Sequence, residues 1–114
     1  MDQKTRLKLE ARARVLKAMA HPSRLLMVER LAGGEMSVAQ LTELVGADMS
    51  TVSKHLSQLR AAGVVADRRQ GAQVYYRLQA PCVMGFFDCV DNVLRAGVQE
   101  RIEIVGGVGE KSHN

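Results

Sequence analysis

Two cysteines near the C-terminal end carry the most distinctive side-chain chemistry in this chain of 114 residues. Cys82 and Cys89 lie seven residues apart, so on one straight helix they share a face but are separated by about 10.5 Å along its axis. That distance is too long for a disulfide within the helix or for one ion bound by both thiols. Thiols paired in another way suit a soft thiophile such as a trivalent arsenical, or oxidation and persulfide chemistry.

A second chemically distinctive group lies within the stretch MSTVSKHLSQLRAAGVV, which begins at Met49. Its apolar residues Val52, Leu56 and Leu59 recur at helical spacing and predict a core-facing stripe, so polar side chains lie on the outer face. Small hydroxyls near the N-terminal end let the backbone approach phosphates, where the helix dipole also helps, and Lys54 can reach phosphates or base edges. The pattern predicts nucleic-acid contact through Ser50, Thr51, Ser53, Lys54 and Gln58, with His55 as a supporting residue at the edge of the apolar row.

Four helices precede or contain these residues. Apolar spacing and capping signals predict helices over residues 4–19, from Pro22 to the glycine pair at 33–34, from Ser37 to Gly46, and over 49–62. Ser37 and Gln40 form a predicted capping box, and Asp48 is positioned to cap the fourth helix. Only the tight turn at residues 46–47 separates the third helix from Asp48, so the third and fourth helices are expected to cross steeply.

After Gly63 the apolar period changes from helical to two, which is typical of strands. The runs at 64–69 and 73–78 are separated by Gln70-Gly71-Ala72, a hairpin signal, and Arg68 and Arg69 make its tip basic. A last helix is expected from around Pro81, fading after residue 97. The predicted fold is mainly α with a β-hairpin wing, a winged helix-turn-helix with four helices, two strands and a fifth helix. We assign residues 1–104 to a single DNA-binding and dimerisation domain and 105–114 to a flexible tail.

Composition narrows the function classes. The formal net charge of +4 and the pI near 9.4 suit a polyanionic partner. No stretch approaches the roughly 18 apolar residues of a membrane span, and the charged N-terminus does not resemble a signal peptide, so we expect a cytoplasmic protein. An enzyme is not expected, because no nucleophile has a base and an orienting group nearby in the pattern, and there is no glycine-rich phosphate loop.

Three segments resemble the ArsR/SmtB family of bacterial transcriptional repressors. They are KAMAHPSRLLMVERL from Lys17, SVAQLTELVGADMSTVSKHLSQLRAAGVV from Ser37 and RRQGAQVYYRL from Arg68, and with the flanking helices the resemblance covers roughly residues 8–97. It implies a homodimer built from the first and last helices, which presents two reading helices to a palindromic operator in double-stranded DNA. Half-sites are then expected about 34 Å apart. The residues expected to contact DNA are Gln40, Ser50, Thr51, Ser53, Lys54, His55, Gln58, Arg68, Arg69 and Gln73.

The inducer sites that the resemblance implies do not transfer to this chain. The arsenic-type site needs a cysteine pair near the stretch EMSVAQL, where this chain has Met36, Val38 and Gln40. The zinc-type site needs histidine along the last helix, but QAPCVMGFFDCVDNVL supplies only carboxylates and thiols. His21 beside a helix-opening proline and His113 near the C-terminus do not complete a ligand set.

The remaining hypothesis concerns the two thiols. If the last helices pair across a dimer axis, Cys82 of one subunit meets Cys89 of the other and forms two symmetric dithiol sites. A trivalent arsenical, another thiophilic metal, or an oxidant or reactive sulfur species would then release the repressor from its operator, whereas DNA binding itself requires no cofactor. Three alternatives stay open at this point: both cysteines are small core residues of the dimer helix, the regulator has no effector chemistry there, or the scaffold serves as a protein-interaction module.

Overall fold

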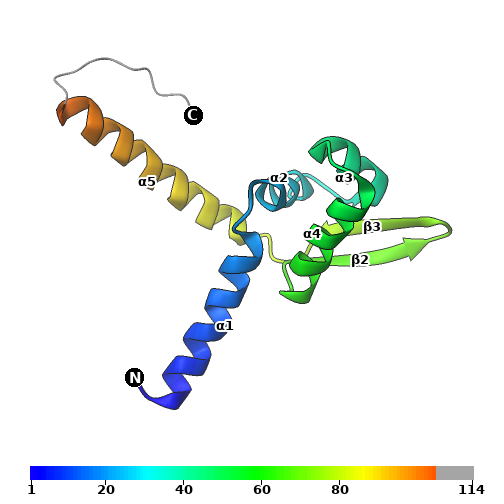
Figure 1. Ribbon diagram of the computed structural model, residues 1–114, viewed down its shortest axis with the longest axis horizontal. Helices are drawn as coiled ribbons and strands as arrows, with labels where there is room; N and C mark the ends of the chain where they lie inside the picture. Colours follow the sequence, from blue (N-terminus) through cyan, green and yellow to red (C-terminus); the bar gives the residue numbers. More distant parts are fainter. Residues whose placement is uncertain (105–114) are drawn as a thin grey trace. The chain divides into compact units, whose positions relative to one another are not determined.

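The computed structural model describes residues 1–104, with side chains through residue 98 (Figure 1). The order of elements confirms the predicted winged helix-turn-helix, with one additional short strand. The predicted flexible tail at 105–114 lies outside the described residues. In chain order the elements are α1 (Gln3–Met19), α2 (Pro22–Leu31), β1 (Met36–Ser37), α3 (Val38–Val45), α4 (Met49–Ala61), β2 (Val65–Gln70), β3 (Gln73–Leu78) and α5 (Val83–Ile104).

The chain divides into two compact units, residues 1–81 and a second unit that begins at Cys82 and contains α5. The first unit holds α1 to α4 and the whole sheet, so it contains both the reading helix and the wing that the sequence predicts. The assignment of residues 1–104 to one DNA-binding and dimerisation domain stays a prediction.

Local capping determines where α3 and α4 begin. The hydroxyl of Ser37 accepts a hydrogen bond from the backbone N–H of Gln40 at 3.1 Å, and the Gln40 amide oxygen accepts one from the Ser37 N–H at 2.8 Å. This reciprocal pair is the predicted capping box. Gly46 ends α3 with a left-handed φ of +78°, a conformation that costs glycine little, and so allows the abrupt reversal into α4.

The sheet has three antiparallel strands in the order β1-β3-β2. Strand β1, only two residues long, was not predicted, because so short a segment carries no measurable period. It pairs Met36 with Tyr76 and Ser37 with Tyr75. Strands β2 and β3 extend past α3 and α4 as the wing (Figure 1) and close through Gly71, whose φ of +63° suits the first central position of a two-residue hairpin turn.

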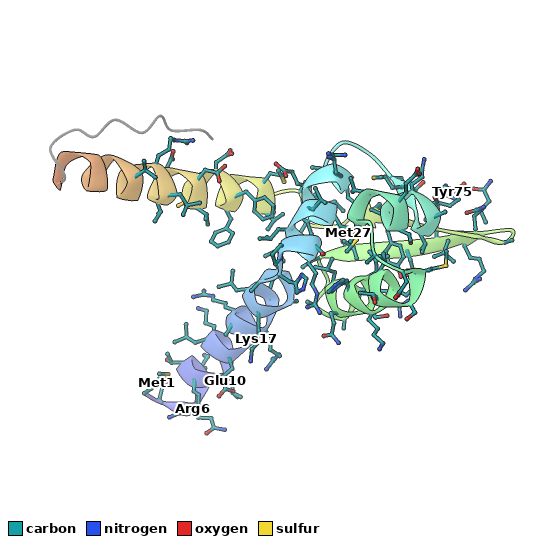
Figure 2. All side chains as sticks on the ribbon, turned by 45° about the horizontal axis from the view of Figure 1, so that its top comes forward. Met1, Arg6, Glu10, Lys17, Met27 and Tyr75 are labelled. Carbon is teal, nitrogen blue, oxygen red and sulfur yellow. The ribbon has the colours of Figure 1, made fainter. Side chains whose placement is uncertain are left out.

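The core of the first unit forms between α2, α3, α4 and the sheet. The predicted stripe of α4 is fully buried there, and Met27 lies where α2 meets the other elements (Figure 2). Because every apolar residue of that stripe faces inward, the polar residues of α4 are forced outward. The buried apolar residues of this unit are Ala18, Met19, Met27, Val28, Leu31, Leu41, Val52, Leu56, Leu59, Val64, Val65 and Tyr76.

Two helices keep apolar side chains exposed. Leu9 and Leu16 of α1 are 42% and 48% exposed, because α1 buries Ala18 and Met19 at its C-terminal end instead. On α5, Val93 and Leu94 are 65% and 62% exposed. Helix α5 also continues to Ile104, past the predicted end near Gly97, since one glycine inside a helix costs only about 1 kcal/mol and good helix formers follow it.

Candidate nucleic-acid interface

The outer face of α4 carries the polar residues that the sequence assigns to DNA. Ser50, Thr51, Ser53, Lys54 and Gln58 are all exposed, and they come from a helix whose opposite face is buried. The turn from α3 into α4 takes only three residues, from Gly46 to Asp48. The fold therefore holds this polar face rigidly at the surface, where it is free to enter a groove of a nucleic acid.

Asp48 occupies the N-terminal end of α4. Its carboxylate accepts a hydrogen bond from the Thr51 backbone N–H at 2.8 Å, and this bond holds the pKa of Asp48 below its ordinary value. The predicted cap is therefore present. It also places a negative charge at the end of the helix where the dipole was expected to attract a phosphate, and it occupies the Thr51 amide. The assignment of Ser50, Thr51 and Lys54 to DNA stays a prediction.

His55 packs at the inner edge of α4. Its Nδ1 accepts a hydrogen bond from Arg24 Nε at 3.0 Å, and its ring lies 4.4 Å from the ring of His21 between centroids. Burial, followed by the nearby His21 and Arg24, lowers the pKa of His55 below its ordinary 6.5. His55 thus links α4 to α2. Its assignment to the DNA contact set stays a prediction, and its ring is already engaged within the protein.

The two wing arginines that the sequence assigns to DNA, Arg68 and Arg69, differ in their contacts. Arg68 donates from Nε and Nη2 to the two carboxylate oxygens of Glu35, at 2.8 Å and 2.7 Å, and from Nη1 to Gln70 at 2.6 Å. Its guanidinium also lies 4.6 Å from the centre of the Tyr75 ring. The hydrogen bond from Arg68 lowers the pKa of Glu35, so this carboxylate stays ionised near neutrality.

The remaining assigned residues of the wing and of α3 are exposed. Arg69 and Gln73 lie near the turn at Gly71, and Arg69 forms no ion pair among the residues whose side chains the structure describes. Gln40 is exposed at the start of α3, but its amide oxygen serves the capping box, which leaves its NH₂ group as the available donor. Of the two arginines near the turn, Arg69 is therefore the one that is open to a phosphate.

Several residues that shape this surface carried no signal in the sequence. Arg60 at the end of α4 forms an ion pair with Asp67 of β2 at 3.2 Å, which joins the reading helix to the wing. Arg24 of α2 likewise donates a hydrogen bond to His55 of α4, and Glu35 accepts one from Arg68 of the wing. Each pair joins residues that are distant or unpatterned in sequence, so only the folded chain brings them together.

The thiols belong to the second unit. Cys82 immediately precedes α5 and Cys89 lies within it, one helical turn short of Val93, and both are exposed free cysteines. Within a protomer, no group of three or more His, Cys, Asp or Glu side chains capable of holding a metal occurs among the described residues.

No helix in the described part of the chain is both long and apolar enough to cross a membrane. The helix pair α3–α4 with its polar outer face, followed by an antiparallel wing, defines a winged helix DNA-binding protein.

Comparison with known proteins identifies the family within this class. Residues 21–67 match the family described as bacterial regulatory protein, arsR family. The nodulation protein NolR of Rhizobium meliloti is 37% identical over 84 residues, which is 74% of this chain and 69% of NolR. The biofilm growth-associated repressor of Xylella fastidiosa is 42% identical over 66 residues, 58% of each chain.

A solved structure agrees over a longer range. The homodimeric winged helix-turn-helix DNA-binding domain Mb0332 from Mycobacterium bovis, studied in solution, matches with a TM-score of 0.74 and 28% identity, and the alignment covers 99% of this chain and 97% of that one. The chain belongs to the ArsR family of bacterial transcriptional regulators. Family membership places it among DNA-binding regulators rather than enzymes, in agreement with the sequence prediction.

Proposed function

We propose that two copies of this chain bind a palindromic operator and repress transcription, with α4 of each copy in a major groove and each wing against the neighbouring backbone. The observation that carries the proposal is the outer face of α4, where hydroxyl, amide and lysine side chains are exposed on a helix fixed by a fully buried stripe. The site of action is the bacterial cytoplasm, where operator DNA lies.

The second copy is proposed to cover the exposed apolar faces of α1 and α5. Leu16 on α1 and Phe86 on α5 are 48% and 45% exposed, and contiguous apolar faces of this kind mark interaction surfaces. The homodimeric Mb0332 domain supports this assembly. A two-fold dimer would present two α4 helices to half-sites about 34 Å apart.

Selection of duplexes from random-sequence DNA by the purified protein, followed by gel-shift titration, tests DNA recognition. A palindromic consensus is expected. The variant Lys54→Gln should weaken binding. It should also reduce the magnitude of the negative slope of log K against log salt by about 0.9 if the lysine contacts one phosphate. Lys8→Gln, which neutralises a lysine on α1 remote from α4, is the control. A folded protein that selects no duplex would instead favour a protein-interaction module.

The effector is proposed to act at the thiols. Cys82 and Cys89 are exposed in the protomer, so neither is a core residue of its own chain. Two sites that each join Cys82 of one subunit to Cys89 of its partner would suit a trivalent arsenical, another thiophilic metal, or oxidation and persulfide chemistry. DNA binding itself is proposed to need no cofactor, with the effector lowering the affinity of the dimer for its operator.

Mixed dimers test this pairing sharply. Homodimers of Cys82→Ser or of Cys89→Ser contain no complete pair, whereas a heterodimer of the two variants keeps one pair, formed by Cys82 of one chain and Cys89 of the other. Phenylarsine oxide should therefore release wild type and the heterodimer from DNA but neither homodimer. Release of both homodimers, or of none of the four species with hydrogen peroxide and a persulfide donor also inactive, would exclude the dithiol site and leave a regulator without effector chemistry there.

A further inference from the structure

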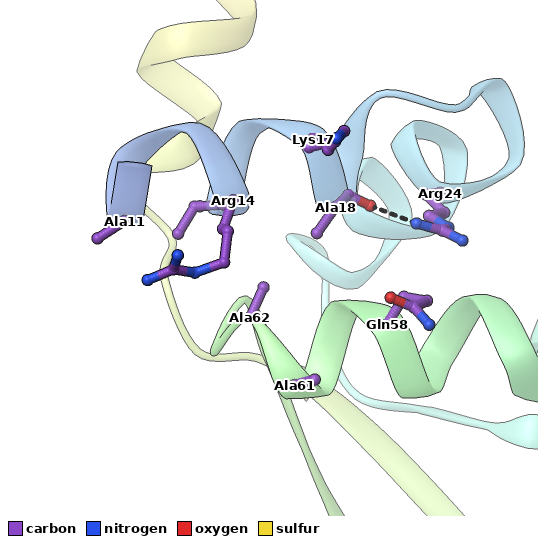
Figure 3. A pocket seen from close by; sticks show the side chains of 9 residues that line it. Ala11, Arg14, Lys17, Ala18, Arg24, Gln58, Ala61 and Ala62 are labelled. Carbon is purple, nitrogen blue, oxygen red and sulfur yellow. Dashed lines mark hydrogen bonds between the residues drawn. The ribbon is translucent and has the colours of Figure 1, made fainter. Parts of the chain in front are cut away.

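A groove of about 470 Å³ lies between the C-terminal half of α1 and the C-terminal end of α4 (Figure 3). Four of its nine lining residues are alanines, whose small side chains leave room for a ligand to approach the backbone. Figure 3 shows Arg14 on the α1 side of the groove, with its guanidinium turned away from Ala62, and Arg24 near Gln58 at the other end. The groove is thus a shallow apolar channel with cationic groups at both ends.

Arg24 is held in position before any ligand arrives. Its Nη1 donates to the carbonyl oxygen of Ala18 at the end of α1, and its Nε donates to His55 Nδ1, both at 3.0 Å. Nη2 donates to no protein atom within residues 1–98. A half-buried guanidinium fixed by two bonds loses little freedom when its remaining edge binds an anion.

The groove adjoins the proposed DNA-contacting surface of α4. A second hollow of about 480 Å³ lies over the outer face of α4 and is lined by Thr51, Lys54 and Ser57 among others. Arg24 and Gln58 line both hollows. A polyanion that contacts Lys54 therefore has a path along α4 into the channel beside α1.

The cations of α1 at this groove are not neutralised by the protein. Lys17 lies at the rim together with Arg14, and neither takes part in an ion pair among the described side chains. Glu10 is the carboxylate that shares a neighbouring hollow with them, without a salt bridge to either. The net charge facing the groove is positive.

We infer that this groove holds a backbone phosphate of the bound duplex, contacted by Arg14 and Arg24 and attracted by Lys17. The inference rests on the proposed function and adds a third contact surface, on α1 and α2, to those of α4 and the wing. Phosphate contacts fix the position of a protein on DNA without reading sequence, so this surface sets register and affinity rather than base preference.

The salt dependence of duplex binding tests the inference. Arg14→Gln should reduce the magnitude of the negative slope of log K against log salt by about 0.9, because one phosphate contact is lost. The reduction should be equal for selected and random duplexes. The control is Arg6→Gln, since Arg6 lies on the half of α1 that extends away from α4 (Figure 2) and does not line the groove. This control should leave the slope unchanged.

A second experiment locates the phosphate. Duplexes with a single neutral methylphosphonate at each successive position are titrated with wild type and Arg14→Gln. One position should weaken wild type but not the variant, as expected for two partners of one contact. Arg24→Lys, checked for unchanged helicity, should lose the same coupling because the single nitrogen of lysine cannot span the separate positions that Nε, Nη1 and Nη2 of the planar guanidinium occupy.

The outcomes separate the two proposals. If wild type selects no duplex, the proposed function fails. If wild type binds a selected duplex but Arg14→Gln keeps its slope and shows no coupled phosphate, the groove inference fails alone. Titration of the free protein with inorganic phosphate tests whether the groove binds a small anion instead of a DNA phosphate. If phosphate binds saturably, and Arg14→Gln abolishes this binding without any effect on DNA binding, the groove is a small-anion site and the inference is overturned.

Discussion

Arg68 of the wing and Glu35 of the loop before β1 form a two-point ion pair, with N–O distances of 2.8 Å and 2.7 Å across a separation of 33 residues in sequence. Arg68 lies directly opposite Tyr75 in the sheet register, and its guanidinium lies over the Tyr75 ring. A guanidinium with three of its nitrogens already bonded has little capacity left for a DNA phosphate. Near the turn of the wing, Arg69 is thus the more open of these two arginines, although the sequence treats the two as equivalent.

Removal of the Glu35 carboxylate should strengthen DNA binding. Glu35→Gln leaves Arg68 free to contact a phosphate. The negative slope of log K against log salt should therefore become steeper by about 0.9, and affinity at low salt should increase. In the wild-type background, Arg69→Gln should lower the slope by a similar amount and Arg68→Gln should change it little. An equal effect of Arg68→Gln and Arg69→Gln in wild type would show that phosphate displaces Glu35.

His55 should make stability depend on pH near neutrality. Because its folded-state pKa lies below its ordinary 6.5, the unfolded chain binds a proton more readily, and the free energy of unfolding contributed by His55 is lost as pH falls below about 6.5 through the folded pKa. A protonated Nδ1 also cannot accept from Arg24.

Urea unfolding from pH 8 to pH 5 measures this effect. His55→Gln keeps an acceptor for Arg24 but does not titrate, so the stability difference between wild type and variant should be constant above pH 7 and should shift against wild type below it. Parallel pH curves would contradict the assignment.

Truncation of the α4 core should destabilise the fold without touching the proposed DNA surface. Leu56 is fully buried, and Leu56→Ala is expected to cost about 2 to 5 kcal/mol in free energy of unfolding because it leaves a cavity. Met49 lies on the same helix but is 53% exposed, so Met49→Ala should cost within about 0.5 kcal/mol. Chemical denaturation of both variants at one protein concentration measures the two losses in free energy of unfolding. Equal losses would contradict the difference in burial between Leu56 and Met49.

A charge on the exposed face of α5 should oppose dimerisation. Leu94 is 62% exposed in the protomer, so Leu94→Asp has no core to disrupt there, but it would place a carboxylate in the proposed interface. Sedimentation equilibrium should show a shift toward monomer, with helix content by circular dichroism retained. Leu94→Met, which keeps an apolar side chain, is the control. An unchanged association constant for Leu94→Asp would remove α5 residue 94 from the interface.

Much of the local structure follows from short-range chemistry that can be read along the chain. The capping box of Ser37 and Gln40, the Asp48 cap and the turn at Gly71 each depend on residues within three positions of one another, and all three are present. The buried stripe of α4 was predictable for the same reason, since helical period alone places Val52, Leu56 and Leu59 on one face. The polar outer face of α4 is the complement of that stripe.

The tertiary structure decided which charged groups remain free. Arg68 is engaged by Glu35, His55 by Arg24, and Arg60 by Asp67, and none of these pairings follows from spacing or composition. An ion pair or a side-chain hydrogen bond depends on positions in space that the sheet register and helix packing set, so residues far apart in sequence become neighbours. The sequence by itself determined the five helices, the two wing strands, the core stripe of α4 and the family, whereas folding added β1, left Arg69 more open than Arg68 and formed the groove between α1 and α4.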